Sequence, residues 1–594
     1  MGKMVRKVID SLHKLFQILS RNQKILGIVV LVCSFIAAVL ETLGVSVIVP
    51  LVNALLQPEQ LFENSYITII TDFMGIHTNE GLILLIISAV ILVYVLKNVF
   101  FIFYAWIKSK YSCKIQRECS VYMMQSYIKR GYSFFLNRNV NELTQGVNGD
   151  VNSLYQIINS VLQAVTQLMI VAFICVYMCY ADWQIAVGVV LSAIICLLII
   201  LVFFRRRMLR AGSKYRNYSI LASQALLQAF QGIKEVLVMR KQKHFVKEFE
   251  ENTIQRQNAT IVQSIGAEIP AYIIEAVCIV GIMAILGIRI VNVSNPENFV
   301  AVLASFAIGA FRILPALGKI SNSINTISSS IPGLNAVYEN IVDARQYNDN
   351  FYNAEVEDEE QYRDLTFEKS VNIQNLTFAY NSEQKKVLNQ LSLEIPKGKS
   401  VAFVGESGAG KSTLADLILG VLTPNEGEVL LDDVNIRKIP RLWGSLIGYV
   451  PQGIYLTDDS ICKNIAFGIE EAEIDENSVK AALEKAELLD FVQGLPNGIH
   501  TKVGDRGVRL SGGQRQRIGI ARALYHDPEI LILDEATSAL DNETEKSVME
   551  AIDSLHGKMT LIIIAHRLTT IKNCDTIYEI VDGKAVKRRY EELI

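Results

Sequence analysis

Six long apolar stretches in the first 320 residues constrain the fold of this chain more than any other feature. A helix needs about 20 consecutive apolar residues to cross a bilayer. In lipid every backbone N–H and C=O group must be bonded within the protein, so stretches of this length become α-helices. The mean hydropathy of +0.29 is accordingly high. We predict an all-α membrane domain with six spans, at about residues 25–56, 82–107, 157–180, 185–204, 265–288 and 299–320.

The distribution of Lys and Arg orients these spans. Segments 108–154 and 206–262 are rich in both residues, whereas segment 57–81 contains neither. Because positive residues stay on the cytoplasmic side, we expect both termini in the cytoplasm and the chain in the inner (cytoplasmic) membrane. Apolar residues scattered through 58–78 fit either an amphipathic helix on the outer interface or a loop packed on the ends of the spans. The net charge of only −3 argues against a nucleic-acid partner.

An acidic run separates the membrane domain from the rest of the chain. Residues 355–360 are EVEDEE and carry almost no apolar side chain, which is typical of a linker. We predict a multi-domain protein with a transmembrane domain over 1–345, an acidic linker over 346–369 and an α/β domain over 370–594. The nine Cys form no C-x-x-C pair, so we expect packing thiols rather than a metal site.

The α/β domain contains a phosphate-binding motif. Residues 405–413 match the pattern G-x4-G-K-[ST] and lie between the apolar run 401–404 and a helical segment. In this order of strand, loop and helix, backbone N–H groups point at a phosphate. Lys411 should reach the β- and γ-phosphates of ATP, and the Ser412 hydroxyl should bind Mg²⁺. The predicted nucleotide-binding residues of the loop are Gly405, Ser407, Gly408, Ala409, Gly410, Lys411, Ser412 and Thr413.

A second motif, residues 510–541, combines a small turn, a helix and a buried strand. The apolar run 530–533 ends in Asp534 and Glu535. A carboxylate pair at the carboxyl end of such a strand is suited to handling Mg²⁺ and water. We therefore predict that Asp534 holds Mg²⁺ and that Glu535 is the general base that orients the attacking water.

Together these motifs resemble the nucleotide-binding domain of the ATP-binding cassette (ABC) family, over about residues 372–588. The resemblance implies that the α/β domain is a P-loop ATPase. It also implies that Tyr380 stacks on adenine and that Gln452 binds Mg²⁺ and senses the γ-phosphate. His566 follows the apolar run 562–565, where the family has a switch histidine that takes part in catalysis.

The resemblance further implies a dimer. In the ABC family the signature turn of one subunit completes the nucleotide site of the other, so a second copy is needed. No motif is degenerate and no internal repeat is visible, which favours a homodimer of half-transporters. Segments 133–151 and 231–236 resemble the two coupling regions of ABC exporters, with ordinary solvated hairpins as the alternative. The signature residues expected at the partner's nucleotide are Ser511, Gly512, Gly513 and Gln514.

Three cations lie within the predicted spans: Lys97, Arg312 and Lys319. Arg312 and Lys319 are seven residues apart, so they share a helix face. Each cation near the middle of the bilayer costs about 2.5–3.5 kcal/mol on insertion scales. The sequence leaves two explanations open. The cations pair with Glu41, Glu268 or Glu275, or the lysines snorkel to the interface; alternatively, the cations bind a phosphate or pyrophosphate of an anionic substrate.

Segments 40–46 and 312–315 resemble bacterial lipid-linked oligosaccharide flippases (PglK-like). That resemblance implies a cavity in which Arg312, Lys97 and Lys319 meet the pyrophosphate of a lipid-linked glycan. Ala271 stands where the flippase has a further arginine. The expected function is thus an ATP-driven flippase that moves a lipid-linked oligosaccharide or related anionic glycolipid from the inner to the outer leaflet. A multidrug, lipid or peptide exporter, or an ATP-gated channel or regulator, remains the alternative.

Overall fold

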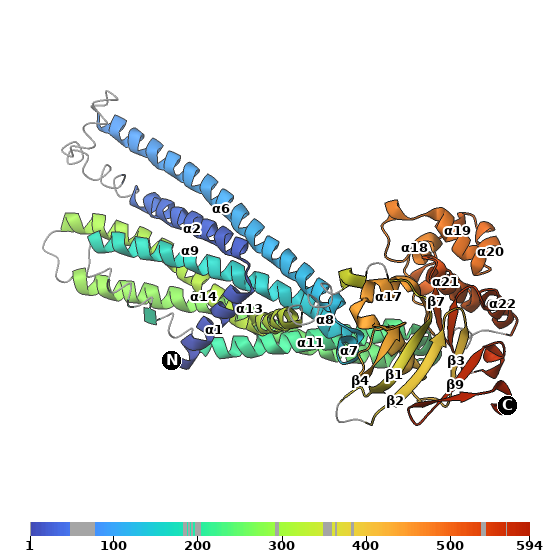
Figure 1. The fold of residues 1–594 in the computed structure, drawn as a ribbon. Helices are drawn as coiled ribbons and strands as arrows, with labels where there is room; N and C mark the ends of the chain where they lie inside the picture. The colour runs from blue at the N-terminus through green and yellow to red at the C-terminus, as the bar shows by residue number, and fades with distance from the viewer. Residues whose placement is uncertain are drawn as a thin grey trace. The chain divides into compact units, whose positions relative to one another are not determined.

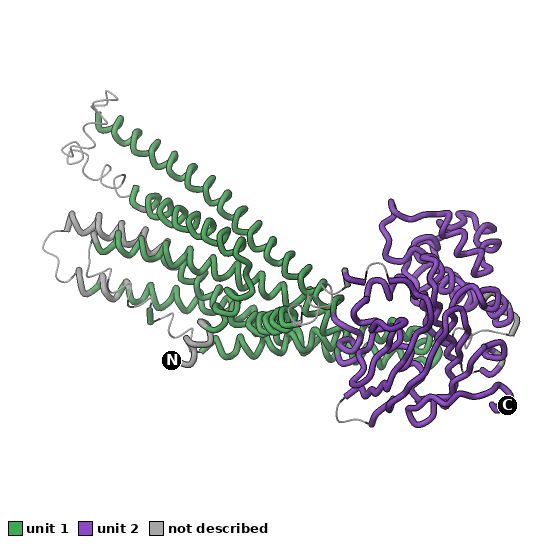
Figure 2. The backbone as a smooth tube through the Cα atoms, viewed as in Figure 1, with its two compact units in different colours: residues 1–129, 138–346 green, residues 130–137, 347–594 purple. Residues whose placement is uncertain are grey.

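The chain forms two compact units in the computed structural model (Figure 2). Unit 1 comprises residues 1–129 and 138–346, and unit 2 comprises 130–137 and 347–594. The structure describes residues 2–47, 51, 78–181, 187, 191, 194–195, 203–290, 296–347, 359–362, 365–381, 385–535, 542–565 and 567–593.

Unit 1 is built from long helices that run side by side (Figure 1). Four of them contain stretches long and apolar enough to span a membrane, within 21–44, 79–129, 140–179 and 242–281. The sixth predicted span, 299–320, is helical throughout. Most of the fourth, 185–204, and the segment 58–77 lie outside the described residues. The helices are α1 (Gly2–Ile18), α2 (Arg21–Ser46), α6 (Asn79–Lys129), α8 (Val140–Gln145), the π-helix η1 (Gly146–Asp150), α9 (Val151–Ala181), α11 (Arg205–Gln231), α12 (Ile233–Val238), α13 (Gln242–Ile290) and α14 (Pro296–Tyr347).

Apolar side chains hold these helices together within the predicted membrane spans. One buried cluster joins α2, α9, α13 and α14. At the other end of α9, Arg216 of α11 makes a two-pronged ion pair with the buried carboxylate of Asp150: Nε lies 2.8 Å from Oδ1 and Nη2 lies 2.8 Å from Oδ2. The apolar cluster consists of Ala38, Ile170, Ile174, Met178, Ile274, Cys278, Ile313, Leu317 and Ile320.

Unit 2 contains two sheets, as expected for the predicted α/β domain. The four-stranded antiparallel sheet has the order β2-β1-β4-β5, and the six-stranded sheet has the order β10-β9-β3-β8-β7-β6. The six-stranded sheet is parallel except for the edge strand β10. The strands are β1 (Ser370–Phe378), β2 (Leu388–Pro396), β3 (Ser400–Val404), β4 (Glu426–Leu431), β5 (Val434–Asn435), β6 (Ile447–Val450), β7 (Ile530–Asp534), β8 (Thr560–Ile564), β9 (Thr576–Val581) and β10 (Lys584–Arg588).

Both faces of the parallel sheet are buried, which explains why its strands are continuous apolar runs. In β7, Ile530 and Ile532 join the core on one face, and Leu531 and Leu533 join the core on the other. The carboxyl ends of β3 and β7 are thereby fixed at one edge, where open α/β sheets bind ligands. The α-helices that follow the strands are α16 (Lys411–Ile418), α17 (Pro440–Leu446), α18 (Ile461–Ile465), α19 (Glu476–Lys485), α20 (Leu489–Gln493), α21 (Gly512–Leu524) and α22 (Asn542–Asp553).

One short helix from the membrane half of the sequence belongs to unit 2. This helix, α7 (Tyr132–Leu136), lies in the segment 130–137. A Cβ built on Gly131 would lie 4.0 Å from the carbonyl oxygen of Val421. The pKa of Tyr449 is raised to about 12, first by burial and then by the nearby groups of Asp534, Asp416 and Tyr132. The first segment that resembles a coupling region is therefore divided, with its beginning packed on the ATPase fold.

Candidate functional site

The predicted phosphate loop joins β3 to α16, as the sequence indicated. Gly408 has φ +84° and Gly410 has φ +104°, values that side chains disfavour. A Cβ on Gly405 would lie 2.6 Å from the carbonyl oxygen of Ile580. These glycines therefore let the loop fold tightly over the sheet, at the N-terminus of α16, where free N–H groups and the helix dipole favour an anion.

Lys411 lies across this loop. Its Nζ donates to the carbonyl oxygens of Gly405 at 2.8 Å and Glu406 at 3.0 Å. Burial lowers the pKa of Lys411, and the charges of Glu535 and Asp534 oppose that shift. Backbone carbonyls are weak partners for a buried ammonium group, so a phosphate oxygen would be a better one. Lys411 is thus placed for the phosphate contact predicted from the motif.

Tyr380 follows β1 and meets the start of α16. Its hydroxyl lies 2.9 Å from Oγ1 of Thr413. Its ring packs edge-on against Phe378, with 5.1 Å between ring centroids, and the residue remains 44% exposed. An aromatic ring held beside the phosphate loop with an open face is suited to stacking on a base.

Glu535 and Gln452 are 83 residues apart in sequence and meet in the structure: Nε2 of Gln452 donates to Oε2 of Glu535 at 2.6 Å. Glu535 has φ +48°, a left-handed conformation, and its N–H donates to the carbonyl oxygen of Ile564 on β8. A non-glycine residue in this region costs free energy, and such strain recurs at functional sites. The fold therefore holds the predicted general base in a costly but fixed position after β7.

The predicted metal ligands offer only oxygen atoms that suit Mg²⁺. They are the hydroxyl of Ser412, the carboxylate of Asp534 and the amide oxygen of Gln452. Ser412 lies in the first turn of α16, Asp534 ends β7, and Gln452 already bonds Glu535 through its amide nitrogen, which leaves its oxygen for a cation. Hard oxygen donors with few protein ligands are typical of nucleotide-bound Mg²⁺. The donor set thus fits the group that the sequence predicted.

The turn at Ser511–Gln514 forms a capping box at the start of α21. Oγ of Ser511 accepts from the N–H of Gln514 at 3.2 Å, and Oε1 of Gln514 accepts from the N–H of Ser511 at 2.8 Å. Such reciprocal bonds fix the first turn of a helix. Ser511 and Gly512 remain exposed, so the positive end of α21 is open to a ligand.

The membrane unit contains a cluster of charged side chains from three helices. Oε1 of Glu41 on α2 lies 2.8 Å from Nη1 of Arg312 on α14, and Oε2 lies 3.2 Å from Nζ of Lys97 on α6. Nζ of Lys97 also lies 4.4 Å from the centroid of the Tyr94 ring, and Nη2 of Arg312 donates to the Tyr94 hydroxyl at 3.4 Å. The three charges sum to +1. The pairing that the sequence left open is thus observed for two of the three cations, and its carboxylate is Glu41.

Lys319 differs from the other two cations. It is exposed on α14 and is not in an ion pair within 4.0 Å among the described residues. Glu268 and Glu275, the other carboxylates considered, are exposed on α13. The positive charge of Lys319 instead repels that of Lys108. Lys319 therefore adds to the positive character of this unit rather than being neutralised.

Both halves of the chain match known protein families. Residues 43–311 match the family model for the ABC transporter transmembrane region, and residues 388–538 match that for the ABC transporter ATPase domain. The chain is 32% identical to the ATP-dependent lipid A-core flippase of Desulfotalea psychrophila over 85% of this chain and 86% of that protein. The chain belongs to the ABC transporter family.

This ABC transporter is 32% identical to the heterocyst differentiation ATP-binding protein HepA of a Nostoc species, over 78% of this chain and 74% of that protein. A bacterial Atm1-family ABC exporter with ATP bound has the same fold, with a TM-score of 0.72 and 22% identity over 94% of this chain and 95% of that one. The predicted fold class and an ATPase coupled to transport are thereby confirmed.

Parts of the predicted ABC site fall outside the described residues. His566 is one of them, and so is Asp541, which the sequence places in the motif after the carboxylates. The structure adds one group that sequence reasoning missed: the pKa of Asp416 is raised to about 6, mainly by burial and further by the charge of Asp534. An acidic residue in an amphipathic helix ordinarily indicates a solvated face, so the sequence carried no signal for it.

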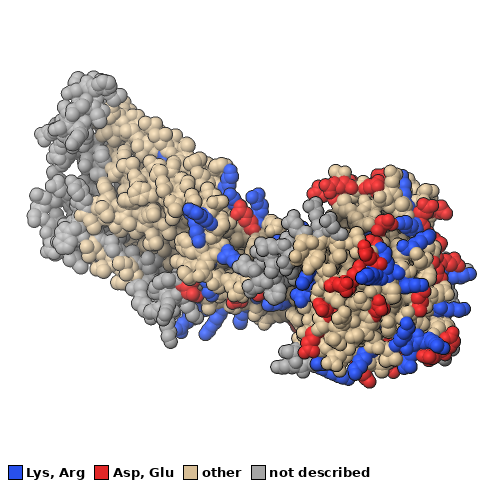
Figure 3. Space-filling model, in the orientation of Figure 1, with Lys and Arg blue, Asp and Glu red and all other residues tan. Residues whose placement is uncertain are grey.

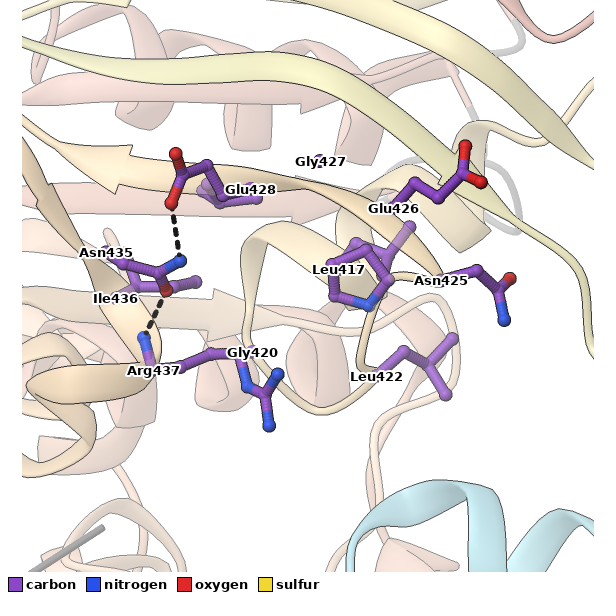
Figure 4. A pocket seen from close by; sticks show the side chains of 12 residues that line it. Leu417, Gly420, Leu422, Asn425, Glu426, Gly427, Glu428, Asn435, Ile436 and Arg437 are labelled. Atoms are coloured by element: carbon purple, nitrogen blue, oxygen red, sulfur yellow. Dashed lines mark hydrogen bonds between the residues drawn. The ribbon is translucent and has the colours of Figure 1, made fainter.

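A pocket elsewhere in the ATPase domain of this ABC transporter is separate from these residues (Figure 4). It has a volume of about 260 Å³ and lies between the end of α16 and strands β4 and β5. Asn435 donates to Glu428 at 2.9 Å and accepts from the N–H of Arg437 at 3.0 Å. Both ends of the Asn435 side chain are thus engaged within the wall of the pocket.

Proposed function

We propose that this ABC transporter is an ATP-driven flippase that moves a phosphate-bearing anionic lipid, such as a lipid-linked oligosaccharide or related glycolipid, from the inner to the outer leaflet. It acts as a homodimer in the cytoplasmic membrane with its ATPase domains in the cytoplasm. The names of relatives such as the lipid A-core flippase support a lipid substrate. The charge of the membrane cluster supports an anionic headgroup.

The observation that carries the proposal is the exposure of Arg312. Its side chain is 38% exposed although one of its nitrogens pairs with Glu41. Guanidinium groups bind phosphate through two parallel hydrogen bonds, so the open side of Arg312 can accept such a ligand. Lys319, two turns along the same helix, adds a second exposed charge. On the face shown in Figure 3 the membrane unit carries few charged residues, so cations here are exceptions that need a function.

The ATPase residues have separate roles in this proposal. Lys411 and the loop N–H groups would bind the phosphates, Tyr380 would stack on adenine, and Ser412, Asp534 and Gln452 would hold Mg²⁺. The bound ion would neutralise charge on the transferred phosphoryl group. Glu535 orients the attacking water and takes its proton, assisted by His566. Gln452 is hydrogen-bonded to Glu535, so it can report the state of the site.

The second subunit supplies the remaining contacts. The open first turn of α21, with Ser511, Gly512, Gly513 and Gln514, binds the nucleotide held by the partner's phosphate loop. A two-fold arrangement then forms two equivalent composite sites. Hydrolysis consequently requires the dimer. A ligand in the membrane cavity can therefore change the rate of hydrolysis by favouring or disfavouring the dimer.

Transport into sealed liposomes tests the proposal. The purified protein is reconstituted with fluorescently labelled phosphatidic acid or with labelled diacylglycerol, which lacks the phosphate. On addition of external ATP, labelled phosphatidic acid should become protected from an external quencher, and diacylglycerol should show no ATP dependence. Equal ATP-driven movement of both lipids would contradict an anionic substrate. Unlabelled polyprenyl-linked oligosaccharide or lipid A-core, added as competitor, then distinguishes the two glycolipid classes.

A further inference from the structure

One carboxylate in the described membrane unit forms ion pairs with two cations. Glu41 lies between Arg312 and Lys97, at 2.8 Å and 3.2 Å. A single negative charge therefore holds two positive ones, and Tyr94 contacts both. The arrangement is asymmetric, because each cation uses a different oxygen of the carboxylate and comes from a different helix.

The two cations differ sharply in exposure. The side chain of Lys97 is 4% exposed, that of Glu41 is 11% exposed and that of Arg312 is 38% exposed. Lys97 also has Gly44 beside it, where an added Cβ would lie 3.4 Å from its Cδ. Lys97 is thus enclosed, while Arg312 alone of the two can reach a ligand.

This asymmetry determines which ion pair can open. If Arg312 turned away from Glu41, the carboxylate would still be compensated by Lys97. Opening the Glu41–Lys97 pair would instead leave the ammonium group of Lys97, whose side chain is only 4% exposed, without a carboxylate, which is strongly unfavourable. The Glu41–Lys97 pair is therefore the fixed part of the cluster, and the Glu41–Arg312 pair is the exchangeable part.

We propose that Glu41 is a resident counter-anion of the substrate cavity, which an incoming headgroup must displace from Arg312. The inference rests on the proposed function, since it concerns the same cavity. A headgroup then binds only if it interacts with Arg312 more strongly than Glu41 does. A headgroup with one carboxylate offers Arg312 no more than Glu41 already does. A phosphate carries more charge and more acceptor oxygens, so it can compete. Glu41 is on this basis a specificity-determining residue that selects phosphate over carboxylate lipids.

ATPase assays of the full-length protein in lipid nanodiscs test this inference. Phosphatidylcholine nanodiscs are prepared with increasing fractions of phosphatidic acid, a phosphate lipid, or of oleate, a carboxylate lipid, and the stimulated rate is divided by the rate without either. The variant Glu41→Gln/Lys97→Met removes the fixed pair and leaves Arg312 without its competitor. We expect half-maximal stimulation at a phosphatidic acid fraction at least about fivefold lower than in wild type, within the range of typical coupling between sites. Oleate should stimulate only the variant.

The control variant is Lys110→Gln, which removes an exposed cation of α6 outside the cluster. Its two dose curves should match those of the wild type. Identical dose curves in Glu41→Gln/Lys97→Met and wild type would overturn the role of Glu41 and leave the proposed function standing. If phosphatidic acid stimulates neither protein, or stimulates Arg312→Ala as strongly as wild type, the proposed function fails and the inference fails with it.

Thermal unfolding provides a second measurement that does not depend on the lipid. An exchangeable Arg312 predicts that Arg312→Gln lowers the Tm less than Lys97→Gln does. A loss for Arg312→Gln equal to or larger than that for Lys97→Gln would show a structural ion pair instead of a displaceable one, and would overturn the inference.

Discussion

Nη1 of Arg312 lies 2.8 Å from Oε1 of Glu41, so an ion pair joins α14 to α2 within the predicted membrane spans. The sequence offered pairing and substrate binding as alternative uses of this arginine. The geometry makes them compatible, because more than a third of the side chain stays exposed although Nη1 pairs with Glu41 and Nη2 donates to the Tyr94 hydroxyl. Arg312 is consequently the residue at which the two uses can be separated by experiment.

Replacement of Arg312 should affect substrate response in graded fashion. Arg312→Ala should lose most of the stimulation of ATPase activity by phosphatidic acid and most flipping. Arg312→Lys should be intermediate, because the charge is kept and the two-pronged geometry is lost. Flipping into sealed liposomes is the measurement. If Glu41→Ala restores flipping to Arg312→Ala, the arginine is only a structural partner of the carboxylate.

Glu535 should be essential for turnover but not for nucleotide binding. If it orients the attacking water, Glu535→Gln should hydrolyse ATP at least about a hundredfold more slowly, the scale of a lost general base. The variant should still bind ATP and accumulate as a closed dimer, detectable by size-exclusion chromatography with ATP. Near-normal turnover in the purified variant would remove Glu535 from catalysis.

Two inactive variants should complement each other when mixed. Lys411→Ala damages the phosphate loop and Ser511→Arg damages the signature turn. A hybrid dimer of the two keeps one composite site intact, so partial ATPase activity should return on mixing and subunit exchange. Each variant incubated alone is the control. Hydrolysis by a strictly monomeric sample would be incompatible with composite sites.

The ion pair between Asp150 and Arg216 should be a major stabilising contact of unit 1. Asp150 is only 1% exposed, so removal of Arg216 leaves a buried carboxylate without its partner and should cost about 3–5 kcal/mol. Arg216→Gln should thus lower the Tm strongly, and Asp150→Leu/Arg216→Met should recover most of the loss. Arg138→Gln, which breaks an exposed pair with Glu142 at 3.8 Å, is the control and should cost less than about 1 kcal/mol. Equal effects of Arg216→Gln and Arg138→Gln would refute this view.

Asp416 should make the stability of unit 2 depend on pH. Because its pKa is raised to about 6, its contribution to stability is present below the ordinary value of 3.8 and is lost as pH rises through about 6. Asp416→Asn should therefore stabilise the nucleotide-free protein at pH 7.5, by about 1 kcal/mol once partial exposure is allowed for. The gain should shrink as pH falls to 5.

Thermal unfolding between pH 5 and 8 in the presence of EDTA measures this effect. Asp433→Asn, at an exposed position of the same unit, is the matched control. A gain for Asp416→Asn that is the same at pH 5 and pH 7.5 would mean that the carboxyl group does not titrate in this range.

The sequence predicted the ATPase core well because its motifs are local. The order of strand, loop and helix at residues 400–418 and the strand that ends at Asp534 are defined by neighbouring residues, and the structure contains both. Contacts between distant elements were harder to predict. Three glutamates were possible partners for Arg312, and only the crossing of α2 and α14 selects Glu41. The raised pKa of Asp416 likewise depends on burial and on a carboxylate from another strand.

The packing of segment 130–137 on the ATPase fold has a consequence for biosynthesis. This segment leaves the ribosome roughly 450 residues before the last strand of the unit it joins, a delay of about 20–90 s at 5–20 residues per second. During that interval segment 130–137 has no ATPase fold to pack on. A nascent chain stalled before β10 should accordingly be more prone to bind a holdase chaperone than the finished protein.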